Sequence, residues 1–248
     1  MALSHSPSIV IDGLVVHIDA GNIKSYPGSG TTLKDLSKNG YDLSTAGTLN
    51  TSNDASAGTI YDHNGSGLIQ TAAFTPISSL TWSIIWWIRT TGTPPSNYRG
   101  IIRLLDTNAG TGSNYPGYYW QTDQRTTTSQ YIHEYQKAWN GTDNQAAWSA
   151  SNVVDIADWT SQAWFCCGVS HNKPAGGNGV FKAYKNGSLK TTRTNSLANS
   201  GYGDINKLLF NTSSGNTIYM GVVSLYDRVL TDSEFEQNFN AFKGRYGL

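Results

Sequence analysis

Charged residues and long apolar runs are both scarce in this chain. Only 14% of its 248 residues are charged, and 17 acidic side chains balance 17 basic ones. A protein whose main partner is a polyanion usually carries a basic excess or stripe, so the balance argues against nucleic acid as a partner. No apolar run approaches the roughly 18 residues that a membrane helix needs, so membrane insertion is not expected.

Cysteine is also scarce, with two adjacent residues, Cys166 and Cys167, in the stretch WFCCGVS. Neighbouring residues of a strand point to opposite faces, so we expect one buried and one outward thiol. A disulfide between such neighbours would be strained, and none is expected. Unpaired cysteines favour folding in a reducing cytosol. The opening MALSHSPSIVIDG lacks the basic region and apolar core of a secretory signal.

Glycine, tyrosine and tryptophan are abundant, with 26, 14 and 8 residues respectively. Asn-Gly pairs separate short runs of alternating apolar and polar residues, which is typical of strands joined by turns. A β-sandwich of roughly 200–250 residues often forms one domain. We predict an all-β chain with one two-sheet antiparallel sandwich over residues 13–248 and an N-terminal arm over residues 1–12.

Individual strands can be predicted from local patterns. Alternation over residues 14–19 predicts a half-buried first strand. The stretch LTWSIIWWIRTT, residues 80–91, is apolar on both faces, which favours a central strand. The segment RGIIRLLD, residues 99–106, is predicted to be its neighbour. The pair Asn186-Gly187 predicts a type I′ hairpin, because both central residues of that turn need a positive φ.

The last 19 residues, LTDSEFEQNFNAFKGRYGL, have the sequence pattern of a helix. Thr231 and Glu234 have the spacing of a capping box. Phe235, Phe239 and Phe242 recur at helical spacing and form one apolar stripe. We therefore predict a C-terminal helix over about residues 232–243 that packs its stripe on the sandwich.

Aromatic residues are concentrated in the least regular part of the chain, residues 106–160. Within it Tyr131, His133 and Tyr135 alternate as in a strand. Exposed rings can stack on the apolar C–H faces of sugars, while neighbouring Asn, Gln and Asp bind the hydroxyls. The candidate carbohydrate-binding residues are Tyr115, Tyr118, Tyr119, Trp120, Trp139 and Trp148.

Aromatic residues also fill sandwich cores, where each buries roughly 150–250 Å². For Trp82, Trp86 and Trp164, which lie on regular strands, the core interpretation is favoured. For the six carbohydrate-binding candidates both interpretations stay open.

Aspartates in turn-rich segments offer oxygen ligands for Ca²⁺, a hard cation that takes six to eight of them. The candidate ligands are Asp19, Asp42, Asp62 and Asp106. None has the spacing of an EF-hand, and the favoured alternative is that such residues make Asx-turns. No other cofactor is expected.

Catalytic residues are not expected. Glycoside hydrolysis needs two carboxyl groups roughly 5–10 Å apart. Of the three glutamates, Glu234 and Glu236 belong to the terminal helix, and Glu134 has no acidic residue two positions away. The chain is therefore predicted not to be an enzyme.

Several stretches carry a resemblance to known families. LTWSIIWWIRT, WFCCGVSH and FKAYKNGSL resemble landmarks of concanavalin A-like, laminin-G-type jelly-roll modules, and VVSLYDRVLTDSEFEQNFNAFKGRYGL resembles their last strand and packed helix. The ends, MALSHSPSIVIDGLVVHIDAGNIKSYPGSGTTLKDLSKNGYDL and NFNAFKGRYGL, are similar to virion structural proteins of tailed bacteriophages, notably T4-like phages of cyanobacteria. The resemblance implies a double-sheet jelly roll displayed on a virus particle, without catalysis.

The expected function is that of a non-enzymatic virion structural protein, made in the host cytoplasm and displayed on the particle surface as capsid decoration, cement or adhesive module. Its expected partners are other virion proteins, further copies of itself and host cell-surface glycans. The alternative is a carbohydrate-binding, lectin-like module of a tail fibre or a free lectin. The arm over residues 1–12 either pairs with a neighbouring sheet edge or frays.

Overall fold

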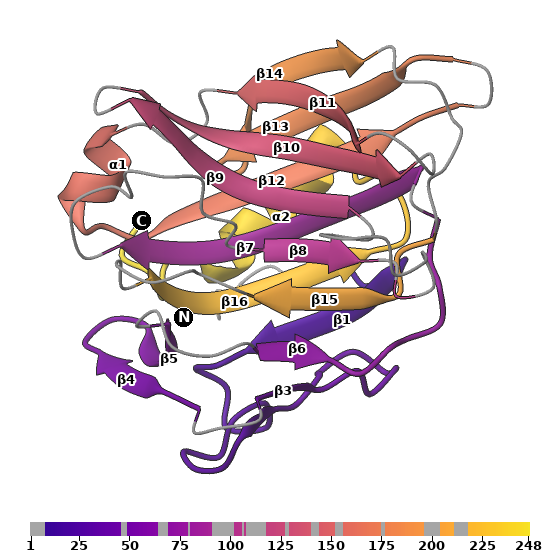
Figure 1. The fold of residues 1–248 in the computed structure, drawn as a ribbon. Coiled ribbons are helices and arrows are strands. Elements are labelled where there is room, and N and C mark those ends of the chain that lie inside the picture. The colour runs from indigo at the N-terminus through magenta and orange to yellow at the C-terminus, as the bar shows by residue number, and fades with distance from the viewer. Residues whose placement is uncertain are drawn as a thin grey trace.

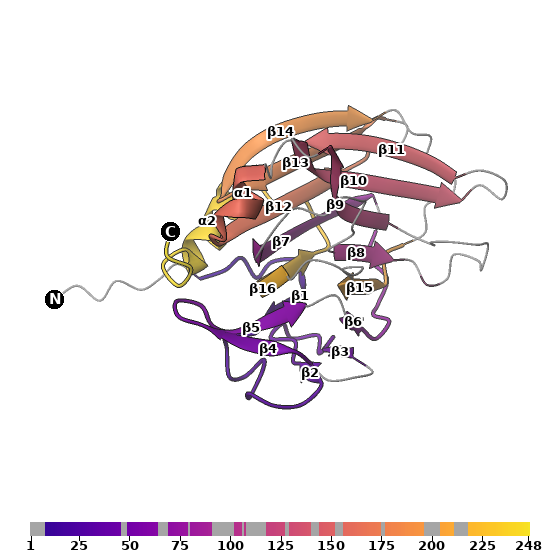
Figure 2. The same cartoon turned by 60° about the vertical axis from the view of Figure 1, so that its left-hand side comes forward.

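The protein forms two stacked antiparallel β-sheets with a helix packed behind one of them (Figures 1 and 2). The computed structural model describes residues 8–45, 49–63, 69–78, 80–90, 102–105, 107, 118–126, 129–139, 144–151, 156–174, 177–195, 204–210 and 218–248. The helices are α1 Ile156–Ser161 and α2 Asp232–Phe242. No described helix is long and apolar enough to cross a bilayer.

Sheet A contains the strands β1 Leu14–Asp19, β4 Thr51–Asp54, β5 Gly58–His63, β7 Thr81–Thr90, β12 Phe165–Asn172, β13 Gly179–Lys185, β14 Ser188–Asn195 and β16 Ile218–Tyr226. Their order is β14-β13-β12-β7-β16-β5-β4, and β1 also pairs with β16. The last strand, β16, changes partner along its length. Its first residues pair with β5, and its residues from Val222 onward pair with β1.

Sheet B contains the strands β2 Thr32–Leu33, β3 Leu43–Thr45, β6 Ile69–Thr71, β8 Ile102–Leu105, β9 Tyr118–Thr126, β10 Ser129–Trp139, β11 Asn144–Ser151 and β15 Lys207–Phe210. Their order is β11-β10-β9-β8-β15-β6-β3-β2. The predicted fold class, a two-sheet antiparallel sandwich with a C-terminal helix, is confirmed.

The strand β7 lies in the middle of sheet A and is buried on both faces, as its sequence predicts. Trp82 and Trp86 belong to the core between the sheets, whereas Trp87 belongs to a second apolar cluster beneath α2. The core interpretation of Trp82, Trp86 and Trp164 is confirmed, because each is at most 5% exposed.

The prediction that RGIIRLLD forms the neighbour of β7 is wrong. β7 pairs with β12 and β16, whereas β8 pairs with β9 and β15 in the other sheet. In a sandwich the chain crosses between the sheets, and both sheets present an apolar inner face. The alternation within a strand therefore predicts burial but not the sheet to which the strand belongs.

The expectation of one outward thiol is also wrong, because Cys166 and Cys167 are both buried. Cys167 faces the core between the sheets and Cys166 lies in the cluster beneath α2. Burial raises the pKa of both thiols. Neither forms a disulfide, as predicted.

The first strand is likewise covered on both faces instead of one. His17 and Asp19, on its predicted polar face, are 7% and 3% exposed. The ring of His17 stacks on Phe242 of α2, and burial lowers the pKa of His17. The C-terminal residues therefore cover the side of β1 that the alternation predicts to be open.

The predicted hairpin and helix are confirmed. Asn186 and Gly187 join β13 to β14 with φ values of 50° and 76°. Thr231 caps α2, and its capping box with Glu234 is complete on both sides. Phe235 is buried against the sheet, where a Cβ on Gly168 would lie 2.7 Å from its ring. The glycine thus lets the helix approach β12 closely.

The described part of the N-terminal arm is docked on α2 of the same chain. The Val10 amide donates a hydrogen bond of 3.0 Å to Oδ1 of Asn238, and the Tyr226 hydroxyl donates one of 3.0 Å to the Val10 carbonyl. Val10 is 7% exposed. The backbone amide and carbonyl of Val10 are therefore both hydrogen-bonded within the same chain. Residues 1–7 of the predicted arm lie outside the described residues.

Candidate binding surface

The protein's own C-terminal segment covers the central part of the outer face of sheet A. Tyr246 stacks on Trp87 with 4.2 Å between ring centroids and is 4% exposed. It fits because residue 221 is glycine: a Cβ there would lie 1.9 Å from the Tyr246 hydroxyl oxygen. Phe239 of α2 stacks on the same indole, at 5.6 Å. The part of this face around Trp87 is therefore occupied.

Asp19, a candidate Ca²⁺ ligand, is held in an ion pair with Arg245. Its Oδ1 and Oδ2 accept hydrogen bonds of 2.9 and 3.0 Å from Nη2 and Nη1 of the guanidinium. The carboxylate is 4% exposed, and Oδ1 also accepts from the Gly21 amide at 3.1 Å. A two-pronged Arg–carboxylate pair of this kind is strong and directional, so this carboxylate joins the first strand to the C-terminal segment.

The other candidate Ca²⁺ ligands lie apart in the fold. Asp42 accepts hydrogen bonds from the Lys34 ammonium at 2.6 Å and from the Asp35 amide at 2.9 Å. Asp62 is a half-buried residue of β5, opposite Tyr219 in the register. Asp106 lies outside the described residues. Within the part of the chain that the structure describes, no group of three His, Cys, Asp or Glu side chains is placed to hold a metal ion.

A second buried carboxylate, Asp54, plays a structural role that sequence reasoning missed. Its Oδ2 lies 2.8 Å from Nη1 of Arg89 and accepts a hydrogen bond from the Trp164 indole. Although burial opposes the shift, hydrogen bonds from the Ala57 and Ser56 amides help to lower the pKa of Asp54 to about 2. No sequence spacing links position 54 to positions 89 and 164, so this site could not be predicted.

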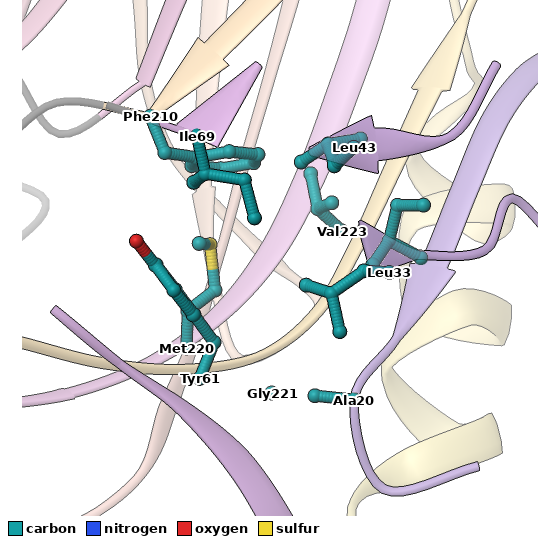
Figure 3. A pocket seen from close by; sticks show the side chains of 10 residues that line it. Ala20, Leu33, Leu43, Tyr61, Ile69, Phe210, Met220, Gly221 and Val223 are labelled. Carbon is teal, nitrogen blue, oxygen red and sulfur yellow. The ribbon is translucent and has the colours of Figure 1, made fainter. Parts of the chain in front are cut away.

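A small pocket opens between the sheets (Figure 3), and its lining is apolar apart from the Tyr61 hydroxyl. Leu33, Leu43, Ile69 and Phe210 come from sheet B, and Val223, Met220 and Tyr61 face them from sheet A. Burial raises the pKa of Tyr61 to about 12. A pocket with one hydroxyl and no ion pair has the chemistry of a core void and offers few partners for the hydroxyls of a sugar.

The aromatic-rich segment forms three long neighbouring strands of sheet B, β9, β10 and β11 (Figure 1). Tyr135 of β10 lies opposite Tyr119 of β9 and opposite Trp148 of β11. Residues directly opposite one another in an antiparallel ladder share a face of the sheet. Tyr119, Tyr135 and Trp148 therefore form one row across the three strands, here called the aromatic row.

The register divides the six carbohydrate-binding candidates. Tyr119 and Trp148 lie in the aromatic row, and Trp139 shares its face, four positions along β10 from Tyr135. Tyr118 and Trp120 alternate with Tyr119 and lie on the opposite face. Tyr115 lies outside the described residues.

Sequence reasoning did not select Tyr135, the central member of the aromatic row, as a carbohydrate-binding candidate. The alternation of residues 131–136 predicts a strand, but only the pairing with β9 and β11 puts this tyrosine between two aromatic residues.

The same register separates two acidic residues of this segment, Glu134 and Asp123. Glu134 lies opposite Trp120, whereas Asp123 lies opposite Tyr131. Positions 120 and 123 are three apart on β9 and so lie on different faces. Glu134 and Asp123 therefore do not flank one site, as the two carboxyl groups of a glycosidase do.

The comparisons with known proteins identify the fold and no family. No family model and no curated protein matches this chain. Among solved structures it is similar to receptor-binding domains of botulinum neurotoxins. The binding domain of serotype D matches with a TM-score of 0.66 and 14% identity, over 93% of this chain and 52% of that chain.

Two further structures match to a similar degree. The serotype D ligand-binding domain in complex with N-acetylneuraminic acid has a TM-score of 0.64 and 13% identity, over 93% of this chain and 51% of that chain. A structure of type C, whose cell entry depends on interaction with two ganglioside molecules, has a TM-score of 0.62 and 16% identity, over 92% and 51%.

These likenesses are to receptor-binding domains and not to catalytic ones. The chain spans about half the length of each neighbour. At this level of identity the likeness shows a shared β-sandwich.

Proposed function

We propose that this chain is a non-enzymatic adhesive module that a tailed bacteriophage displays on its particle surface, as capsid decoration or as an attachment domain. The observation that carries the proposal is the arrangement of the sandwich. Its own C-terminal helix and tail cover the outer face of sheet A around Trp87, while sheet B carries a row of aromatic residues from three strands. The protein's partners are other virion proteins, further copies of itself and cell-surface glycans.

Two lines of comparison support this function. The shared fold with receptor-binding domains supports an adhesive role. The resemblance of both ends of the sequence to virion structural proteins of tailed phages supports display on a particle. The placement of Asp123 and Glu134 on different faces supports a function without catalysis.

The proposal is tested by the copy number of this chain in purified particles of the phage that encodes it, measured by quantitative mass spectrometry against the major capsid protein. A ratio near that of the shell subunit supports capsid decoration or cement. A few copies per particle support an adhesive module of the tail or a vertex. Absence from the particle refutes the virion role.

A second candidate function is that of a lectin-like module of a tail fibre or a free lectin, and the aromatic row specifically favours it. This candidate predicts binding of isolated glycans by the purified chain. It is therefore distinguished from pure capsid cement by a binding measurement without particles.

A further inference from the structure

The aromatic row can be assigned to one side of sheet B from its neighbour β8. In β8, Ile102 and Leu104 are buried in the core between the sheets, and the partly exposed Arg103 alternates with them. The backbone register pairs Arg103 with Tyr119. Because paired residues share a face, the row Arg103–Tyr119–Tyr135–Trp148 lies on the face of sheet B opposite to the core.

Aromatic residues are unevenly divided between the two faces of β9, β10 and β11. The face opposite to the core carries Tyr119, Tyr131, Tyr135, Trp139 and Trp148, by alternation and register. The core face carries only Tyr118 and Trp120. A protein that used aromatic residues solely to fill its core would show the reverse division, and apolar residues gathered on an outer face commonly mark a binding site.

We propose that this face of sheet B is an oligosaccharide-binding site, with the aromatic row as the stacking surface. The inference rests on the proposed adhesive function and gives it a location and a ligand class. Neighbouring strands lie about 4.8 Å apart, so the three aromatic positions span about 10 Å. That length suits two consecutive sugar rings, each stacked by its C–H face.

The residue types around the aromatic row favour a glycan over a protein partner. The same face carries Gln121, His133 and Lys137 in the positions beside the row on β9 and β10, Ala146 and Ala150 beside it on β11, and Asn144 farther away, opposite Trp139. A protein–protein interface typically has an apolar centre with few charges and a polar rim. Here residues with an amide, an imidazole and an ammonium group lie two positions from Tyr119 and Tyr135 on β9 and β10, and such groups bind the hydroxyls of a sugar.

The register also excludes some aromatic residues from the proposed site, because it places them on the other face of sheet B. Tyr118 and Trp120 lie on the core face, although the sequence makes them as good candidates as Tyr119. The inference therefore makes opposite predictions for adjacent residues. Loss of Tyr135 is expected to weaken binding, whereas Trp120, whose register places it on the core face, is expected to make no contribution to binding.

The experiment measures binding of the full chain to a printed array of purified bacterial and animal oligosaccharides, followed by titration of the strongest hit. Tyr135→Ala and Trp148→Ala are each expected to weaken binding about tenfold or more, as truncation of an aromatic anchor typically does. Tyr135→Phe keeps the ring and is expected to retain binding. Leu189→Ala removes a 40% exposed apolar side chain from sheet A and is the matched control.

Thermal unfolding by circular dichroism is recorded for each variant. Folded Tyr135→Ala and Trp148→Ala proteins with lost binding support the site. Folded variants that bind like the wild type overturn it, and so does global unfolding of both variants, since that would assign the aromatic row to the core. A wild-type chain that binds no oligosaccharide on the array also overturns the site. Its presence in purified particles would still support the virion role.

Discussion

Gly221 and Tyr246 form a contact whose energetic coupling can be worked out from the structure. Gly221 lies in β16 between the segment paired with β5 and the segment paired with β1. A Cβ at this position would lie 1.9 Å from the Tyr246 hydroxyl oxygen and 2.6 Å from the ring carbon that bears it. We therefore predict that Gly221→Ala expels Tyr246 from its place on Trp87.

The cost of expelling the ring should equal that of deleting it. Truncation of a buried aromatic side chain typically costs about 3 to 5 kcal/mol, so Gly221→Ala and Tyr246→Ala are each expected to lower the free energy of unfolding by about that amount. In the Tyr246→Ala background the clash is gone. There Gly221→Ala should stabilise the strand by about 0.5 to 1 kcal/mol, because alanine loses less backbone entropy on folding than glycine.

The assay is a double-mutant cycle from urea unfolding curves of the wild type, the two single variants and the double variant. The expected coupling energy is about 3 kcal/mol or more, well above the deviation from additivity that independent sites show. If Gly221→Ala costs the same in both backgrounds, the contact with Tyr246 is not the reason for glycine at this position. If Gly221→Ala is neutral in the wild type, the reasoning is refuted.

Three further outcomes are expected. Hydrogen bonds from Arg228 lower the pKa of Glu234 to about 2. The ionised carboxylate therefore contributes its full stabilisation above its unfolded pKa of about 4.5, and this stabilisation is lost as the pH falls through about 2. Urea unfolding across that window should therefore show a weaker pH dependence for Glu234→Gln than for the wild type. Cys166 and Cys167 should not react with Ellman's reagent in the native protein, because both thiols are buried and have raised pKa values. Both should react in guanidinium chloride. Rapid reaction of the native protein would contradict the packing beneath α2. Removal of divalent cations with EDTA should leave the unfolding temperature unchanged, because Arg245 and Lys34 already neutralise two of the candidate calcium ligands; a clear drop would establish a structural metal.

The parts of the fold that could be predicted from sequence are those specified by contacts within one segment. The capping box at Thr231, the positive-φ pair at Asn186 and the apolar run of β7 each have a local physical cause. Cys166 shows where such reasoning ends. Cys166 is buried because α2 packs over its side of the sheet, and no residue near position 166 predicts where α2 packs.

The candidate site has the same division between local and long-range information. Aromatic content selects the segment that supplies the carbohydrate-binding candidates, but the face of each residue depends on pairings across three strands. The face on which the aromatic row lies is identified from the pairing of Tyr119 with Arg103 of β8. The ion pair of Asp19 with Arg245 joins positions 226 residues apart, and no spacing rule reaches that far.

The docking of the C-terminal segment on the first strand has a consequence for synthesis of the protein in the cell. Sheet A needs β16 between β7 and β5, and β1 needs both β16 and the tail that follows it. While the ribosome is still translating the middle of the chain, the apolar outer face of β7 therefore has no cover. Long-range pairings of this kind form slowly and leave aggregation-prone surface exposed in the meantime. Because α2 and residues 243–248 follow every described strand in the sequence, the domain can complete its folding only after they leave the ribosome.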